Sequence, residues 1–190
     1  AADRPRVAGL DEVGRGTWAG PVTAAAVILP LERADLLELL AGVRDSKQLS
    51  PAARAALEPA IRSAALAVGL GEASAAEIDA QGIVAATRLA MARALAALAV
   101  APQALVIDAL RLPAVDLPQR AFPRADARCL SVAAASVVAK VARDRLMAEL
   151  DEAYPGYGFA AHKGYGTAEH RAALARLGPS PIHRMTWRPL

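Results

Sequence analysis

Short apolar runs alternate with longer helical patterns along this chain, and this alternation limits the fold more than any other feature of the sequence. Residues 7–10 and 22–29 are compact apolar runs separated by a glycine-rich connection, which predicts two buried strands paired as a hairpin. Further runs of strand length lie near 67–70 and at 104–107. Strands that alternate with helices predict an α/β fold with a mixed central sheet flanked by helices.

The helical patterns have recognisable ends. Ser50 and Pro51 fit an N-cap and a first helical residue, and Ser74 with Glu77 fits a capping box. Gly178, followed by proline, fits a helix end. We expect helices at 31–40, from 51 towards 66, after Ser74, beyond Gly82, at 131–150 and at 167–177.

The length and composition favour one domain spanning residues 1–190. The 190 residues contain no repeat, low-complexity tract or long linker. The apolar stretches are far shorter than the ~20 residues that span a bilayer, and no secretory signal is visible. The single cysteine, Cys129, cannot form an internal disulfide and has no neighbours at zinc-site spacing. We therefore expect a cytoplasmic protein with no membrane segment.

The net charge of +3 is too small to indicate a nucleic-acid-binding protein, but the distribution of charge is more informative. Residues 154–190 contain five basic side chains against one acid, Glu169, together with five aromatic side chains. Bases interleaved with aromatics are typical of surfaces that follow a nucleic-acid backbone, although an ordinary basic loop-rich surface would look the same. The aromatic residues are Tyr154, Tyr157, Phe159, Tyr165 and Trp187.

Four carboxylates stand near predicted strand ends or in a loop. Asp11 and Glu12 directly follow the first apolar run, where two neighbouring anions repel unless a cation lies between them. Asp108 ends the strand at 104–107, and Asp126 precedes the long helix. Successive strand residues point to opposite faces, so Asp11 and Glu12 can share a metal only if the strand ends or bends there. Spacing alone leaves a divalent-metal site and an ordinary acidic pair both open.

The glycine-rich connection begins with Gly14, Arg15 and Gly16. It does not match the spacing of a dinucleotide-binding loop, and the preceding carboxylates would repel a pyrophosphate. Glycines let backbone amides approach sugar and phosphate closely, and an arginine adds a fork of donors. Such a loop could contact the 2′-hydroxyl that distinguishes RNA from DNA.

Several segments together resemble one family. The opening Gly-Leu-Asp-Glu-Val-Gly-Arg-Gly at 9–16, followed by Ala-Gly-Pro-Val at 19–22, resembles the first signature of the bacterial ribonuclease HII family. Asp-Ser-Lys at 45–47, the alanine-rich segment 133–145, and the tyrosine- and glycine-rich segments 154–159 and 162–167 resemble its later blocks in the same order. The resemblance covers nearly the whole chain.

This resemblance implies a ribonuclease H-like fold and an endonuclease that hydrolyses the RNA strand of RNA/DNA hybrids. It also implies incision 5′ of ribonucleotides embedded in duplex DNA, with two Mg²⁺ or Mn²⁺ ions and products carrying 5′-phosphate and 3′-hydroxyl ends. The family's acidic metal ligands fall on Asp11, Glu12, Asp108 and Asp126. Ala109 stands where the family usually has glycine, which affects only the shape of the loop. Arg124-Ala125 stands where lysine-glycine is frequent, and this loss of backbone freedom makes Asp126 the least secure of the four.

The resemblance implies substrate contacts as well. Gly14, Arg15 and Gly16 match the motif that reads the ribonucleotide, Tyr165 matches the tyrosine that stacks on the adjoining deoxyribose, and Lys47 matches a phosphate-contacting lysine. From spacing alone, Tyr165 fits a core aromatic better than a stacking residue, and the resemblance reverses that preference. The expected partners are RNA/DNA hybrids, ribonucleotide-containing DNA duplexes and a replication clamp, and we expect a monomer.

Other readings of the sequence remain open. Another metal-dependent nuclease, such as a Holliday-junction resolvase, could also use clustered carboxylates, and a non-catalytic nucleic-acid-binding domain could keep the same shape. Arg143 could be a phosphate contact or a solvated charge. The three histidines have no zinc-protease spacing, so we expect structural or phosphate-facing roles for His162, His170 and His183.

Overall fold

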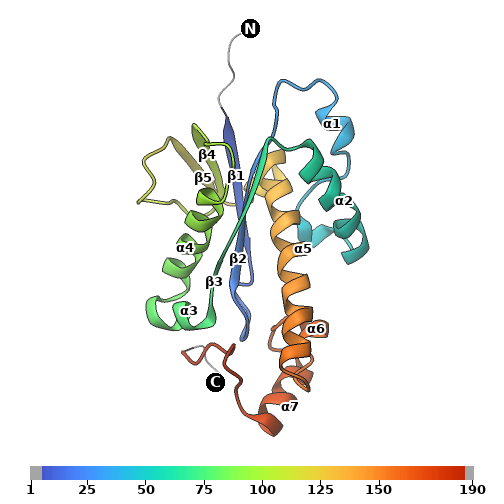
Figure 1. Cartoon of the computed structure of the whole chain (residues 1–190), viewed down its shortest axis with the longest axis vertical. Coiled ribbons are helices and arrows are strands. Elements are labelled where there is room, and N and C mark those ends of the chain that lie inside the picture. The colour runs from blue at the N-terminus through green and yellow to red at the C-terminus, as the bar shows by residue number, and fades with distance from the viewer. Residues whose placement is uncertain (1–5, 187–190) are drawn as a thin grey trace.

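A mixed five-stranded sheet forms the centre of the computed structural model, which describes residues 6–186 (Figure 1). The strand order is β3-β2-β1-β4-β5. β1 pairs antiparallel with β2 and parallel with β4, so the predicted hairpin and mixed sheet are confirmed. The strands are β1 (Val7–Val13), β2 (Val22–Ile28), β3 (Ala67–Ala73), β4 (Ala104–Asp108) and β5 (Gln119–Phe122).

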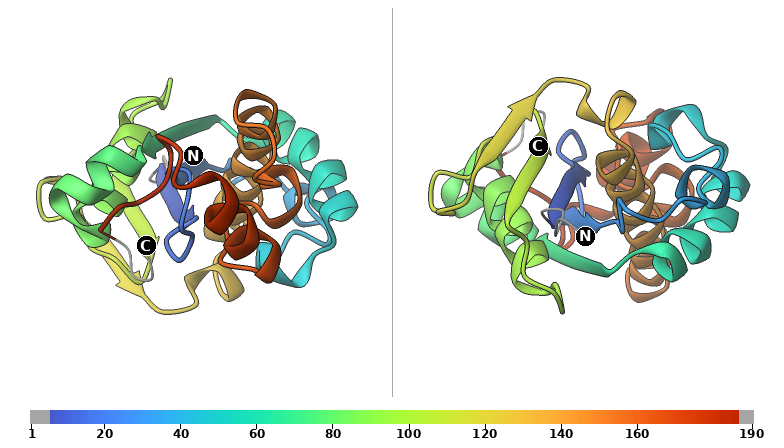
Figure 2. Two further views of the ribbon diagram at one scale, coloured as in Figure 1. Left: turned by 90° about the horizontal axis from the view of Figure 1, so that it is seen from below. Right: turned by 90° about the horizontal axis from the view of Figure 1, so that it is seen from above.

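Helices cover both faces of this sheet. One face is covered by α4 (Ile83–Ala96), and the other by the long helix α5 (Leu130–Ala153), with α2 (Pro51–Ala64) packed outside α5 (Figures 1 and 2). The remaining elements are α1 (Leu36–Leu39), η1 (Ser46–Gln48), α3 (Ala75–Gln81), η2 (Ala125–Ala127), α6 (Phe159–His162) and α7 (Ala168–Leu177). None of the helices in the described part of the chain is long and apolar enough to cross a membrane.

The sheet separates two apolar cores. Leu10 and Ile107 face α4 and pack with Met91, whereas Val27 faces α5 and packs with Val137. Every residue of β2 is buried, because helices cover both of its faces. The three consecutive alanines of β2 let α4 and α5 approach the sheet closely, so the apolar composition predicted from the sequence belongs to a two-sided core.

Most predicted element ends are close to those observed. Ser50 accepts a hydrogen bond from Ala53, and Ser74 and Glu77 form the predicted capping box. The helix expected at 31–40 is wrong in extent, since only 36–39 are helical, after a turn held by the Arg33–Asp35 ion pair. β5 was not predicted, because it is a short edge strand of four residues, two of them polar, with no apolar run to mark it.

The C-terminal part forms a third, smaller core beyond the sheet, against the last turns of α5 (Figure 1). Tyr157 and Phe159 are buried in this core, and Arg184 is fully buried beside it. The expectation of an open aromatic and basic surface is therefore wrong for these side chains. Trp187 and Arg188 lie outside the described residues.

Candidate active site

Two carboxylates come together where two parallel strands end. Leu10 of β1 is in register with Ile107 of β4, so the next residues, Asp11 and Asp108, lie beside each other. Alternation along each strand points both side chains to the face covered by α5. The pairing of β1 with β4 stops at this point, while its pairing with β2 continues to Val13.

Glu12 lies inside β1 rather than after it. The sequence predicted that the strand would have to end or bend for Asp11 and Glu12 to cooperate. Instead β1 continues where β4 ends, and Asp108 at that end acts electrostatically on both residues. Arg15 donates a hydrogen bond of 3.2 Å to Oε1 of Glu12. Oε2 is buried and has no hydrogen-bond partner among the described residues.

The carboxyl groups at this site are costly to ionise. Burial, followed by repulsion from Glu12, raises the pKa of Asp11 to about 8. Burial also raises the pKa of Glu12, with Asp108 adding repulsion and Arg15 opposing it. Buried carboxylates without matching positive charge are costly, and a cation relieves that cost.

Asp126 joins the group through the turn after β5. Oδ1 of Asp108 accepts a 2.8 Å hydrogen bond from the backbone N–H of Ala125, which ties η2 to the end of β4. Asp126 is buried, and its pKa is raised by burial and then by the charges of Asp45 and Asp108. Ala109, where the ribonuclease HII pattern usually has glycine, adopts a left-handed conformation with φ 56°.

The four carboxylates suit a divalent ion by their chemistry, but they are not closed around one position. Within residues 6–186, no three carboxylate, imidazole or thiolate groups are arranged to hold a metal ion as they stand. The unpartnered Oε2 of Glu12 and the raised pKa of Asp11 nevertheless indicate that this donor set is short of positive charge. Hard oxygen donors of this kind are the ligands that Mg²⁺ and Mn²⁺ prefer.

Lys47 is exposed at the edge of the same group. Although partial burial lowers its pKa, the charges of Asp45, Asp11, Asp126 and Asp108 raise it overall. The hydroxyl groups of Ser46 and Ser136 are 2.9 Å apart, which fixes η1 against α5 beside Asp11. The lysine ammonium therefore stays charged next to the carboxylates.

The two glycines of the Gly-Arg-Gly loop have different structural requirements. Gly14 has φ +89°, and a Cβ there would overlap the guanidinium of Arg143. Gly16 is exposed, has no unusual φ, and would place a Cβ in open space. The fold requires glycine at position 14 but not at position 16.

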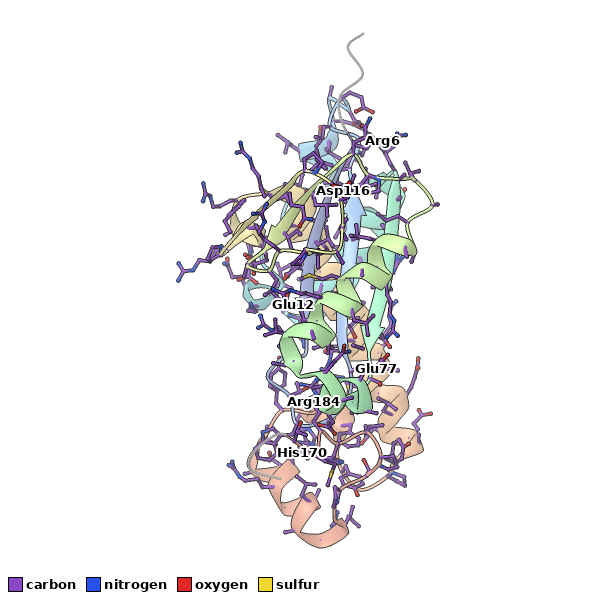
Figure 3. The ribbon with its side chains drawn as sticks, turned by 90° about the vertical axis from the view of Figure 1, so that its left-hand side faces the viewer. Arg6, Glu12, Glu77, Asp116, His170 and Arg184 are labelled. Carbon is purple, nitrogen blue, oxygen red and sulfur yellow. The ribbon has the colours of Figure 1, made fainter. Side chains whose placement is uncertain are left out.

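Two arginines hold this loop from behind, and sequence reasoning missed both roles. Arg143, interpreted as either a phosphate contact or a solvated charge, is fully buried and donates to backbone oxygens of Pro21, Lys163 and Ala19. Arg184 is also fully buried and donates to Gly14 at 2.6 Å, Arg15 at 2.9 Å and Gly20 at 2.9 Å. Figure 3 places Arg184 between Glu12 and His170 along the molecule. No signal in the sequence around either arginine indicated this burial, because Arg143 stands beside Asp144 and Arg184 beside His183.

Tyr165 is exposed on the loop between α6 and α7, with 42% of its surface accessible. It is therefore not the core aromatic that spacing alone allowed. The loop adjoins the Gly-Arg-Gly loop, since the backbone N–H of Trp18 donates to the carbonyl of Gly164 at 2.8 Å. His170 and His183 are buried behind Tyr165, which agrees with a structural role.

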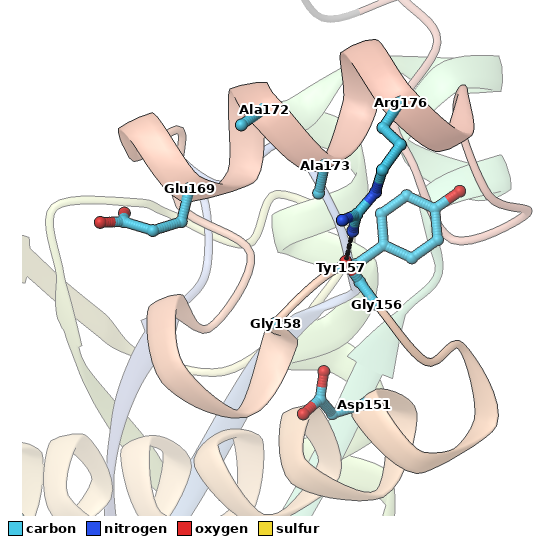
Figure 4. A pocket seen from close by; sticks show the side chains of 8 residues that line it. All are labelled: Asp151, Gly156, Tyr157, Gly158, Glu169, Ala172, Ala173 and Arg176. Atoms are coloured by element: carbon cyan, nitrogen blue, oxygen red, sulfur yellow. Dashed lines mark hydrogen bonds between the residues drawn. The ribbon is translucent and has the colours of Figure 1, made fainter.

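A separate hollow between the end of α5 and α7 lies in the C-terminal part (Figure 4). Asp151, Glu169 and Arg176 line it, and Arg176 donates to the carbonyl of Gly156 at 2.8 Å. None of the four carboxylates described above lines this hollow.

Comparison with known proteins identifies relatives over nearly the whole chain. Residues 8–189 match the family described as Ribonuclease HII. The ribonuclease HII of Chloroflexus aurantiacus is 58% identical over 184 residues, covering 97% of this chain and 87% of that protein. Among solved structures, the ribonuclease H2 of Pyrococcus horikoshii has a TM-score of 0.78 at 28% identity, covering 96% of this chain and 94% of that one. Ribonuclease HII of Archaeoglobus fulgidus, solved in complex with PCNA, has a TM-score of 0.79 at 28% identity, covering 96% and 95%.

Proposed function

The chain belongs to the ribonuclease HII family of endonucleases that cut the RNA strand of RNA/DNA hybrids, and from this premise we propose its substrate selection and chemistry. It incises DNA duplexes 5′ of a single embedded ribonucleotide, as well as hybrids, with two divalent ions. The products carry 5′-phosphate and 3′-hydroxyl ends. The observation that carries this proposal is the group of buried and half-buried carboxylates beside the Gly-Arg-Gly loop, in which Oε2 of Glu12 has no hydrogen-bond partner among the described residues.

Asp11, Glu12, Asp108 and Asp126 would hold the ions. Magnesium or manganese bound there would activate water and stabilise the leaving oxygen. The protein's own part is to bring these buried and half-buried carboxylates together: the strand ends set Asp11 beside Asp108, and Arg15 orients Glu12 through Oε1. Lys47, which stays charged, is placed to contact a phosphate at the same edge.

The loop and the tyrosine would select the substrate. Gly16 leaves room for a sugar to approach the backbone, because the space that a Cβ would occupy there is open. The fold itself does not require glycine at this position, so a substrate contact can explain it. Arg15 is partly exposed and supplies donors beside Glu12. Tyr165 presents its ring from the adjoining loop, where it can stack on the deoxyribose next to the ribonucleotide.

The proposed partners are RNA/DNA hybrids, DNA duplexes containing ribonucleotides and a replication clamp. The complex of the Archaeoglobus protein with PCNA supports the clamp as a partner of this chain. The single-domain organisation, the monomeric state and the cytoplasmic location remain predictions.

A cleavage assay tests this proposal. Three substrates are compared, each with and without Mg²⁺ or Mn²⁺: a DNA duplex with one ribonucleotide, an RNA/DNA hybrid and an all-DNA four-way junction. We expect metal-dependent incision just 5′ of the ribonucleotide, cutting of the hybrid and no cutting of the junction. Hybrid cutting without incision at single ribonucleotides would overturn the proposed selection, and junction cutting would favour a resolvase.

A further inference from the structure

The loop that carries Tyr165 is bound tightly to the Gly-Arg-Gly loop. Besides the hydrogen bond from Trp18 to Gly164, Arg143 donates to the carbonyl of Lys163 at 2.9 Å. A Cβ on Gly166 would overlap the ring of Trp18. The position of Tyr165 is therefore set by contacts behind it rather than by its own exposed side chain.

A chain of hydrogen bonds through two histidines reaches the backbone of Tyr165. The N–H of Ser180 donates to Nδ1 of His183 at 2.8 Å, the two Nε2 atoms of His183 and His170 are 3.0 Å apart, and Nδ1 of His170 lies 2.9 Å from the carbonyl of Tyr165. A neutral imidazole has one donor and one acceptor nitrogen. Since Nδ1 of His183 accepts, its Nε2 donates to His170, and the remaining proton of His170 is donated to Tyr165.

The surroundings of His170 keep this chain neutral. His170 has no accessible surface, and its ring packs against Trp18, Phe159 and the ring of His162, whose centroid is 4.3 Å away. Burial, with repulsion from the other two histidines, lowers the pKa of His170 to about 4. His162 and His183 are the titratable side chains that act on it. Each imidazole proton is thus committed to a particular acceptor.

We propose that His170 is a positioning residue that fixes Tyr165 relative to the Gly-Arg-Gly loop, through the hydrogen bond from its Nδ1 to the Tyr165 carbonyl. The inference rests on the proposed role of Tyr165 in selecting embedded ribonucleotides. Without this bond, the Tyr165 carbonyl loses its link to His170 and keeps the hydrogen bond from the N–H of Thr167. The neighbouring residues of the loop are still held by Trp18, His162 and Arg143. Selection of single ribonucleotides should then weaken more than general cleavage.

A matched pair of substitutions separates the two hydrogen bonds of His170. The amide of asparagine reaches the position of Nδ1, so His170→Asn keeps a donor for the Tyr165 carbonyl and loses the bond to His183. The longer glutamine reaches the position of Nε2, so His170→Gln keeps the partner of His183 and loses the donor to Tyr165. Thermal unfolding of both variants measures any general loss of stability.

The readout is a selectivity ratio: kcat/KM on the single-ribonucleotide duplex divided by kcat/KM on the hybrid. We expect His170→Gln to lower this ratio about fivefold or more, towards that of Tyr165→Ala, and His170→Asn to retain it. In the Tyr165→Ala background, His170→Gln should have no further effect on the ratio, because the two changes act through one contact. A purely structural role would lower both rates together in either variant and in either background.

The outcomes are distinguishable. An unchanged ratio in Tyr165→Ala overturns the proposed selection by Tyr165 itself, and the positioning role falls with it. A changed ratio in Tyr165→Ala with an unchanged ratio in His170→Gln overturns only the positioning role. Nitrogen-15 NMR of the imidazoles tests the geometry separately: a proton on Nε2 instead of Nδ1 of neutral His170 would contradict the hydrogen-bond chain.

Discussion

The carboxylates at the strand ends and the loops beside them satisfy their polar groups in opposite ways. Oε2 of Glu12 is buried without a hydrogen-bond partner among the described residues, and Asp11 has a raised pKa. A few residues away, the buried guanidinium of Arg184 donates to three backbone carbonyls, and each neutral histidine nitrogen faces a partner. The buried polar groups of the loops have hydrogen-bond partners within the protein, whereas the carboxylates need an added cation to balance their charge.

Because of this difference, substitutions in the two regions should affect stability and activity to different degrees. Uncompensated buried charge destabilises a fold, and hydrogen-bonded buried groups specify one conformation. A substitution among the carboxylates should therefore affect activity more than stability. A substitution among the loop contacts should affect both activity and stability, unless the substituted position faces open space, as Gly16 does.

The largest expected effect is on the carboxylate side. Asp11→Asn removes a buried carboxyl group that is costly to ionise and is a proposed metal ligand, so we expect cleavage in Mg²⁺ to fall on the order of 10²-fold or more while thermal stability without metal is unchanged or rises. Mg²⁺ should raise the melting temperature of the unsubstituted protein and do so much less in the variant. Initial rates and melting curves measure both effects.

Asp116→Asn is the matched control, because Asp116 is exposed on the connection between β4 and β5 and lies towards the Arg6 end of the molecule, away from Glu12 (Figure 3). It should change neither the rate nor the metal-dependent melting shift. Full activity in Asp11→Asn would contradict its proposed role at the metals.

Gly14 and Gly16 test, within one short loop, whether contacts that hold the fold can be separated from contacts with substrate. Gly14→Ala forces a left-handed φ on alanine and overlaps Arg143, so we expect the free energy of unfolding to fall by about 2–3 kcal/mol. Gly16→Ala should change stability by less than about 0.5 kcal/mol. It should still lower cleavage at a single ribonucleotide roughly tenfold, which corresponds to about 1.4 kcal/mol of lost contact with the sugar.

Chemical denaturation and the cleavage assay, applied to both variants, decide this prediction. An active Gly16→Ala enzyme would mean that the open space at position 16 does not receive substrate. A stable Gly14→Ala protein would mean that the arginines do not fix the loop.

The sequence predicted the sheet and the carboxylates better than the contacts that hold the loops. The strands of 22–29 and 104–107 were predictable because apolar runs of this length have few alternatives, and the resemblance selected the four acids. Arg143 and Arg184 could not be placed, because a guanidinium that donates to distant carbonyls looks in sequence like any solvated arginine. Tyr157 and Phe159 were likewise grouped with Tyr165, because the sequence does not show which aromatic side chains are buried. Of these three, Tyr165 is exposed, whereas Tyr157 and Phe159 are buried.

Acid should weaken the loop contacts through His170. Its pKa of about 4 in the folded state lies below the ordinary value of 6.5, so the unfolded chain binds more protons between these values. The free energy of unfolding should therefore fall as the pH decreases from about 6.5 towards 4, with about 1–2 kcal/mol of this loss at pH 5 arising from His170. Denaturation at several pH values, compared with His170→Asn, isolates this contribution. An identical pH dependence in the two proteins would show that His170 is not buried as a neutral group.

The smallest expected effect is on the salt dependence of substrate binding, which should differ between Lys47 at the carboxylates and Arg184 behind the loop. Lys47 is exposed among the carboxylates, so Lys47→Ala should weaken binding of a ribonucleotide-containing duplex only severalfold in EDTA, and lower the slope of log affinity against log salt by about 0.9. Arg184 is buried and donates to backbone carbonyls, so Arg184→Lys should leave that slope unchanged even where a displaced loop lowers the affinity. Titrations at several salt concentrations give both slopes. Equal reductions in the two variants would mean that Arg184 also neutralises a phosphate, and the division between loop contacts and substrate contacts would then fail.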